Sequence, residues 1–277
     1  MRTLMIKTHE AWLEMLMAGS MSRTENRQTL LDFSDILFRH FTWIEHEFIC
    51  RNKTYNYDRD AIPVKVTRLG DILKNITIRL NEIDLQLLST EDKALTERIS
   101  SDIRYMTGVL QHMKDETVTA FSMQRKFPDI TLTQEATDAL TLFLFEETYK
   151  EYELIMIYNY LKAHSEDAYL NRIFQILIDE SFFHLKSFCD MSAKMGILAV
   201  PRVVMKELYQ IEDVTQFLRD GIDEEFAAKE ECRKLSEAVA KDSPELEKFF
   251  DFINNQENYH IALMEDALKH FLKKTNV

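Results

Sequence analysis

The sequence predicts an all-α protein. Only five Gly and four Pro occur among 277 residues, so turn-forming positions are few and the elements between them are expected to be long. Apolar residues recur every three to four positions over long stretches, which is the spacing of one face of a helix. With 45% apolar and 29% charged residues, the chain can bury one large core or two moderate ones.

The first part of the chain, residues 1–128, is predicted to form an N-terminal helical region. Its helices are expected over residues 3–19, 22–52, 63–88 and 89–125. Ser22 and Glu25 form a capping-box pattern at the start of the second helix, and Pro63 suits the first turn of the third. Pro128 ends the fourth helix, because proline disfavours the helical conformation in the residue before it.

The segment HFTWIEHEF in this region carries His40, Glu45, His46 and Glu47. Such a cluster could indicate a haemerythrin-like iron site, but that site needs several histidines from several helices. The other helices of the region offer no histidines at matching spacing. We therefore interpret the cluster as a solvent-exposed face.

Residues 131–275 are predicted to form a four-helix bundle. Its helices are expected over residues 131–163, 168–194, 213–240 and 243–273. Thr131 and Gln134 form a capping box for the first helix, and Ser243 followed by Pro244 is typical of a helix start. Short turns join the first helix to the second and the third to the fourth, whereas a longer crossover joins the second to the third. This is the connectivity of a bundle with a single crossover.

Two pairs of polar residues interrupt the apolar stripes of this predicted bundle. Glu257 and His260 are three residues apart in the last helix, so they lie one turn apart on one face and could hold the same ion. Glu180 and His184 interrupt the stripe of the second helix, and their spacing of four also places them on one face. A buried carboxylate needs a partner, and a metal cation is the strongest one available.

The other two helices of the predicted bundle supply single carboxylates. Glu147 lies on the inward seam of the first helix, with Glu151 one turn beyond it, and Glu224 lies on the seam of the third. Glu225 is the alternative to Glu224, because an error of one residue in the helical phase would exchange them. Tyr158, on the seam of the first helix, is interpreted as a packing residue.

The spacing of these residues provides an independent check. Glu147 precedes Glu180 by 33 residues, and Glu224 precedes Glu257 by 33 residues. The two helical hairpins therefore place their glutamates at the same interval along the chain. A bundle built from them would bring two single glutamates and two Glu/His pairs to one level.

One Glu from each of two helices and a Glu-x-x-His motif from each of the other two form the ligand set of the ferritin-like di-iron and di-manganese carboxylate proteins. Residues 131–275 resemble this superfamily, and its rubrerythrin and bacterioferritin branch most. The resemblance implies two Fe ions, two Mn ions or one of each. It implies these six ligands: Glu147, Glu180, His184, Glu224, Glu257 and His260. The segment ESFFH departs from the motif by one extra residue, so either a π-bulge absorbs this residue or Glu180 binds in an altered geometry.

The resemblance implies a redox protein that acts on oxygen or peroxide as an oxidase, peroxidase or oxygenase, with a small organic molecule as a further candidate substrate. No CxxC pair is present, so an external electron donor is expected. The alternative is a metal-free helical interaction protein whose inward polar side chains satisfy one another. In either case residues 1–128 are candidates for forming a homodimer.

Charge and cysteine content restrict the other partners and the compartment. A formal net charge of −13 argues against nucleic acid and an anionic membrane surface, because both would repel the chain. No uncharged run approaches the length of a membrane span. Three cysteines without CxxC spacing indicate neither a disulfide framework nor a zinc ribbon, so a reducing cytoplasm is expected.

Overall fold

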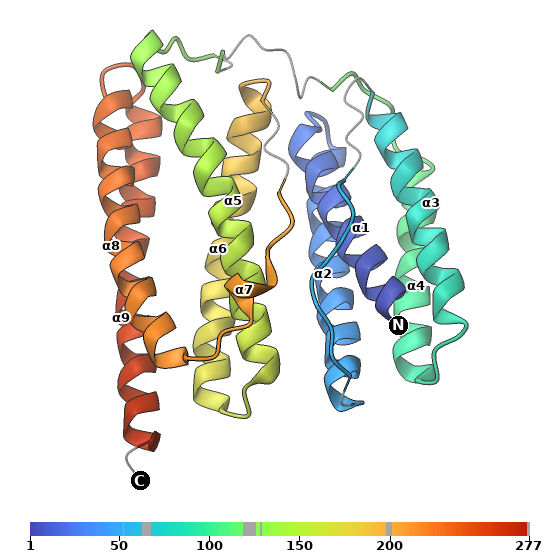
Figure 1. The fold of residues 1–277 in the computed structure, drawn as a ribbon. Coiled ribbons are helices and arrows are strands. Elements are labelled where there is room, and N and C mark those ends of the chain that lie inside the picture. Colours follow the sequence, from blue (N-terminus) through green and yellow to red (C-terminus); the bar gives the residue numbers. More distant parts are fainter. Residues whose placement is uncertain (52, 63–67, 119–125, 128, 198–200, 276–277) are drawn as a thin grey trace. The chain divides into compact units, whose positions relative to one another are not determined.

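The computed structural model describes residues 1–51, 53–62, 68–118, 126–127, 129–197 and 201–275. Over these residues the protein is all-helical, with no strand, which confirms the predicted fold class (Figure 1). The helices are α1 (Arg2–Met21), α2 (Asn26–Cys50), α3 (Leu69–Leu87), α4 (Lys93–Leu110), α5 (Gln134–His164), α6 (Ala168–Lys194), α7 (Lys206–Tyr209), α8 (Val214–Val239) and α9 (Pro244–Thr275).

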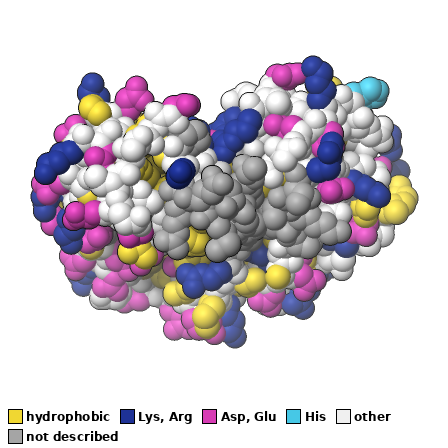
Figure 2. All heavy atoms as spheres, turned by 90° about the horizontal axis from the view of Figure 1, so that it is seen from above, with side chains coloured by type: hydrophobic (Ala, Val, Ile, Leu, Met, Phe, Trp, Pro, Cys, Tyr) yellow, Lys and Arg dark blue, Asp and Glu magenta, His cyan; other side chains and the backbone are white. Residues whose placement is uncertain are grey.

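The chain divides into two compact units. Unit 1 comprises Met1–Met123 together with Gly196–Met205, and unit 2 comprises Gln124–Met195 together with Lys206–Val277. None of the helices in the described ranges is long and apolar enough to cross a lipid bilayer. On the face drawn in Figure 2, acidic and basic side chains are interspersed.

Unit 1 is organised around α1, which packs against both α2 and α3, while α4 packs against α3 and α2. Almost every residue of α1 from Thr8 onwards is buried, as expected for a helix that is apolar on most of its sides. Trp12 has no exposed surface, and its ring lies 4.7 Å from that of Phe38. The crossover segment that follows α6 joins this unit, because Arg59 Nη2 donates a hydrogen bond to the Pro201 carbonyl at 2.6 Å.

The buried charges of unit 1 have protein partners. Arg79 donates hydrogen bonds to Glu10 and to Glu14, and both carboxylates are buried. His40 and Glu45 are buried as well, so the interpretation of their segment as a solvent-exposed face is wrong for these two residues. They fall on the stripe of α2 that faces the core, where His40 Nε2 lies 2.9 Å from Asp102 Oδ2.

Unit 2 contains four long helices, each packed against two of the others. The pairs in contact are α5 with α6, α8 with α9, α5 with α8, and α6 with α9. Aromatic side chains fill the interior at one level, where Phe143 makes edge-to-face contacts with Phe188 and Phe250. The four helices begin and end within three residues of the predicted limits.

Some predicted helix ends differ from the structure. Thr133, not Thr131, caps α5: its hydroxyl accepts from Ala136 N at 3.3 Å and donates to Asp242 Oδ2 at 2.7 Å. Ser22 does not cap α2, because its hydroxyl donates to Glu116 instead. The helix predicted to reach residue 125 ends at Leu110, after which the chain turns back and Thr117 forms a β-bridge with Arg68.

Asp167 connects the start of α6 to the end of α9. Its carboxylate accepts from the backbone N–H groups of Tyr169 (2.9 Å) and Leu170 (3.2 Å), which otherwise have no partner within the helix. The other carboxylate oxygen accepts from His270 Nε2 at 2.8 Å and Lys274 Nζ at 2.5 Å. This residue therefore fixes the relative position of two helices that carry the site described below.

We expect Asp167→Ala to lower the free energy of unfolding by about 1–2 kcal/mol, because the helix start loses its cap. Asp167→Asn is the matched control, since an amide oxygen still accepts from the backbone but carries no charge for His270 and Lys274. Urea unfolding followed by circular dichroism measures both. Equal loss in the two variants would show that the charge, and not the cap, is what matters.

Candidate metal centre

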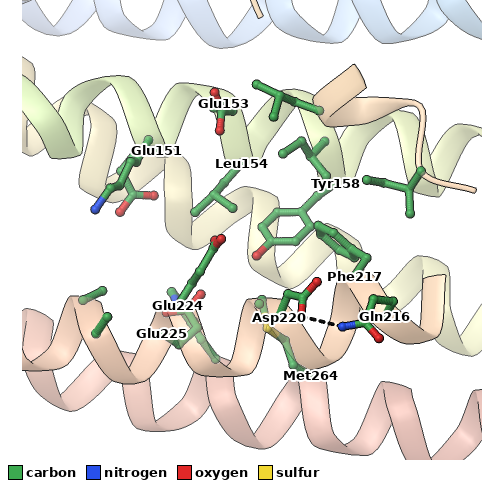
Figure 3. Close-up of a pocket in the computed structure, with 18 of the residues that line it drawn as sticks. Glu151, Glu153, Leu154, Tyr158, Gln216, Phe217, Asp220, Glu224, Glu225 and Met264 are labelled. Atoms are coloured by element: carbon green, nitrogen blue, oxygen red, sulfur yellow. Dashed lines mark hydrogen bonds and ion pairs between the residues drawn. The ribbon is translucent and has the colours of Figure 1, made fainter. Parts of the chain in front are cut away.

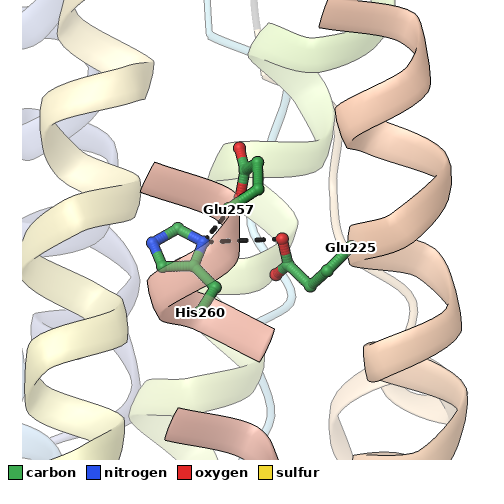
Figure 4. A group of neighbouring side chains, drawn as sticks. All are labelled: Glu225, Glu257 and His260. Carbon is green, nitrogen blue, oxygen red and sulfur yellow. Dashed lines mark ion pairs between the residues drawn. The ribbon is translucent and has the colours of Figure 1, made fainter. Parts of the chain in front are cut away.

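Glu225, Glu257 and His260 form a buried cluster in the middle of unit 2 (Figure 4). One potential ligand atom from each lies within 4.8 Å of the other two. His260 Nδ1 is 2.7 Å from Glu257 Oε2 and 3.5 Å from Glu225 Oε2. Glu257 and His260 face the same way because they are one turn apart on α9, and Glu225 reaches them from α8.

A second group from α5 and α6 adjoins this cluster. The ring of His184 lies 5.7 Å from that of His260, measured between centroids. His184 Nδ1 is 2.8 Å from Glu151 Oε1, and His184 Nε2 is 3.1 Å from the amide oxygen of Gln256. Two imidazoles and carboxylates from four helices therefore meet at one level of unit 2.

The extra residue in ESFFH does not produce a π-bulge, because α6 is α-helical throughout its length. Glu180 and His184 instead turn toward different partners. Glu180 Oε2 lies 2.5 Å from His260 Nε2, whereas His184 contacts Glu151. Ser181, which is buried, occupies the position three residues before His184 where a Glu-x-x-His motif would have its glutamate.

The structure brings together four of the six predicted ligands: Glu180, His184, Glu257 and His260. Glu147 is buried one turn away from Glu151, and its Oε1 accepts from Lys150 Nζ at 2.7 Å. Glu224 is exposed. Glu151 and Glu225 lie in the positions that Glu147 and Glu224 were expected to hold.

The phase of α8 explains why Glu225 points inward. The buried residues of this helix include Leu218, seven residues before Glu225, and Cys232, seven residues after it. A spacing of seven places all three on the same seam. Reading the seam from Leu218 and Cys232 would have identified Glu225 in the sequence, and the interval of 33 residues between Glu151 and His184 would have drawn attention to Glu151.

Protons are held tightly in this cluster in the absence of a cation. Burial alone would lower the pKa of His184, but the carboxylate of Glu151 raises it to about 9. Burial also opposes protonation of His260, yet its hydrogen bonds with Glu180, Glu225 and Glu257 raise its pKa to about 12. Burial, with the neighbouring Glu225 carboxylate, raises the pKa of Glu257 to about 8. At neutral pH both imidazoles are therefore charged and Glu257 keeps its proton.

Two buried polar atoms at the site lack a hydrogen-bond partner among the described residues. One is Glu151 Oε2, whose neighbouring oxygen contacts His184, and the other is the hydroxyl of Tyr158. An ionised carboxylate oxygen with no donor is costly to bury, and a cation would offset that cost. Carboxylates with one imidazole per ion suit Fe or Mn better than a tetrahedral zinc site. Among the described residues, Glu225, Glu257 and His260 form a group that could hold one cation, with Glu151 and His184 beside it.

In metal-free protein we expect stability to fall as the pH rises from 6 to 9. The folded state holds a proton on His184 up to about pH 9, whereas the unfolded chain releases it near pH 6.5, so this contribution is complete below pH 6.5 and lost by pH 9. For His184 alone the loss is on the order of 3 kcal/mol. Glu257 acts in the same direction up to about pH 8.

Melting temperatures of EDTA-treated protein at pH 6, 7, 8 and 9 test this expectation. His184→Gln is the control: it keeps a polar side chain but cannot titrate, so its profile should be flatter. A flat profile for the wild-type chain would contradict the proton-holding cluster.

No family model, curated protein or solved structure matches this chain.

Proposed function

We propose that this protein is a ferritin-like di-metal redox protein that holds two Fe ions, two Mn ions or one of each in unit 2. It would act on oxygen or peroxide as an oxidase, peroxidase or oxygenase. The observation that carries the proposal is the convergence of four carboxylates and two imidazoles from four helices. These side chains are Glu151, Glu180, His184, Glu225, Glu257 and His260.

The order of these residues along the chain supports the ferritin-like assignment. A carboxylate on α5 precedes a Glu/His pair on α6, and a carboxylate on α8 precedes a Glu/His pair on α9. The loops between α5 and α6 and between α8 and α9 are short, while a longer segment separates α6 from α8. This order and connectivity match those of the ferritin-like carboxylate proteins, although Glu180 and His184 are four residues apart instead of three.

The charge of the cluster favours cations over a purely protein network. Four carboxylates face two imidazoles, so negative charge remains even when both imidazoles are protonated. Two divalent ions would balance the four carboxylates with both imidazoles neutral. Since ligands must lose their protons to bind a metal, loading would release the protons that His184, His260 and Glu257 hold.

Two Fe or Mn ions would supply one-electron redox steps and open positions for oxygen or peroxide. The chain itself orients the ligands. Gln256 accepts a hydrogen bond from His184 Nε2 and so fixes the orientation of that ring. The free cysteines form no CxxC pair, so electrons would come from an external donor.

One observation favours the metal-free interaction protein as a second candidate. Each nitrogen of the two imidazoles already contacts a carboxylate or an amide oxygen: Glu151, Gln256, Glu180 and Glu257. Two protonated histidines could therefore hold the helices together without a metal. Metal analysis separates the two candidates.

We expect about two Fe or Mn ions per chain in protein purified from cells supplied with both metals, measured by inductively coupled plasma mass spectrometry. Glu225→Gln and Glu151→Gln should each lose at least half of this metal, because a neutral amide oxygen lacks the negative charge that a carboxylate offers a divalent cation. Their matched controls, Glu224→Gln and Glu147→Gln, remove the same charge from a neighbouring position and should keep it. Equal metal content in all four variants would contradict the proposal. So would the absence of bound metal in the wild-type protein after anaerobic reconstitution with Fe(II).

Loaded protein should also consume oxygen or hydrogen peroxide in the presence of a chemical reductant. We expect His260→Ala to reduce that rate at least tenfold, because one ion loses its imidazole. An oxygen electrode and a peroxide assay measure the two rates, and Glu224→Gln serves as the control. Rates that match those of free metal ions would count against an oxidase or peroxidase.

A further inference from the structure

A cavity of about 840 Å³ lies beside the carboxylate–histidine cluster (Figure 3). Residues of α5, α7, α8 and α9 and of the loop before α8 line it, so it belongs entirely to unit 2. Glu225, Glu257 and His260 form part of its wall. Oxygen and peroxide need far less space, whereas small organic molecules occupy cavities of this size.

One part of the cavity wall, next to the carboxylate–histidine cluster, is apolar. Leu154, Ile157 and Tyr158 come from α5, Phe217 from α8 and Met264 from α9. The rings of Tyr158 and Phe217 meet edge to face with their centroids 6.3 Å apart. These walls would accept an apolar body, and aromatic faces also attract cations.

The hydroxyl of Tyr158 is a polar group within this apolar part of the wall. Its side chain is 1% exposed, and the hydroxyl has no hydrogen-bond partner in the part of the chain that is described. Tyrosine hydroxyls that are buried normally have a partner. In Figure 3 the ring lies between Leu154 and Phe217, among the side chains that line the cavity. A polar group on a bound molecule would satisfy this hydroxyl.

The outer part of the cavity is acidic. We define its rim as six carboxylates: Glu153, Glu207, Glu212, Asp213, Asp220 and Glu224. Lys150 is the single Lys or Arg among the described lining residues. Its Nζ donates a hydrogen bond to Glu147 Oε1 at 2.7 Å. Carboxylates crowded around a concave opening produce a negative potential that attracts cations and repels anions.

We propose that this cavity binds an organic amine, with its ammonium group at the rim and its apolar body between Tyr158 and Phe217. A molecule held in this way lies next to His260 and its carboxylate partners. The amine would be the organic substrate of the di-metal centre, and in that role the inference rests on the function proposed above. The binding itself depends only on the rim and the apolar walls.

The test uses three amines that differ in their apolar group: 2-phenylethylamine, tryptamine and hexylamine. Each amine is compared with a carboxylate that carries a similar apolar group: phenylacetate, indole-3-acetate and hexanoate, respectively. Isothermal titration calorimetry on the full chain, both EDTA-treated and metal-loaded, measures the dissociation constants. We expect at least one amine to bind ten or more times tighter than its carboxylate partner, with weaker binding at higher salt.

The variant Asp220→Asn/Glu224→Gln should weaken amine binding about tenfold without changing metal content. Asp223→Asn is the matched control, because Asp223 is an exposed carboxylate of α8 outside the cavity lining. Ala228→Trp, which places a large side chain in the cavity, should abolish binding whatever the charge of the rim.

Three outcomes would overturn the inference: no binding by any amine, equal binding of amines and carboxylates, or amine binding that the rim and cavity variants leave unchanged. Slower Fe(II) loading in the rim variant without amine binding would make the rim a route for metal ions and would also overturn it. Amine binding by a protein that takes up no metal would support the cavity and reject the di-metal function. Metal uptake without amine binding would reject the inference about the cavity and support the di-metal function.

Discussion

Charge neutralisation in the interior of unit 2 is the constraint on which the rest of the site depends. Glu151, Glu225 and Glu257 are buried and Glu180 is half-buried, yet they surround only two imidazoles. Ionised carboxylates in such a place must be protonated, paired or bound to a metal. In the absence of a metal, the raised pKa values of His184, His260 and Glu257 show protons filling this role. Any cation bound here would compete with protons for the same oxygens and nitrogens.

Unit 1 shows how this chain buries charge when no cation is needed. Glu10 and Glu14 receive hydrogen bonds from Arg79, and Glu45 receives them from the hydroxyls of Tyr55 and Tyr57. Each of these carboxylates has a protein donor. Unit 2 differs because its carboxylates face one another and two histidines, and one oxygen of Glu151 has no donor among the described residues. The carboxylates of unit 2 therefore have fewer protein donors than those of unit 1.

The two halves of the cluster are not equivalent. On one side Glu225, Glu257 and His260 come from α8 and α9, as the single-glutamate and Glu-x-x-His pattern requires. On the other side Ser181 occupies the place of the glutamate, and Glu180, one position earlier, reaches across to His260 instead. Two ions held here would have different ligand sets and therefore different affinities. The cavity is lined by Glu151 from one half and by Glu225, Glu257 and His260 from the other, so it borders both halves of the cluster.

The sequence by itself determined the helices of unit 2 and the polar residues that α6 and α9 bring to the site. Scarce Gly and Pro, capping residues such as Asp213 and Ser243, and the spacing of Glu257 and His260 are local properties, and local hydrogen bonding and periodicity decide them. Tertiary structure decided which carboxylate meets the histidines. On α5 both Glu147 and Glu151 are buried on one face, and the level at which α6 packs brings Glu151 to His184. On α8 the choice of Glu225 over Glu224 depends on how the helix rotates about its axis to pack against its neighbours. A rotation by one residue, about 100°, costs nothing in local propensity and is fixed only by long-range contacts. The same contacts created the acidic cavity, whose residues lie far apart in sequence.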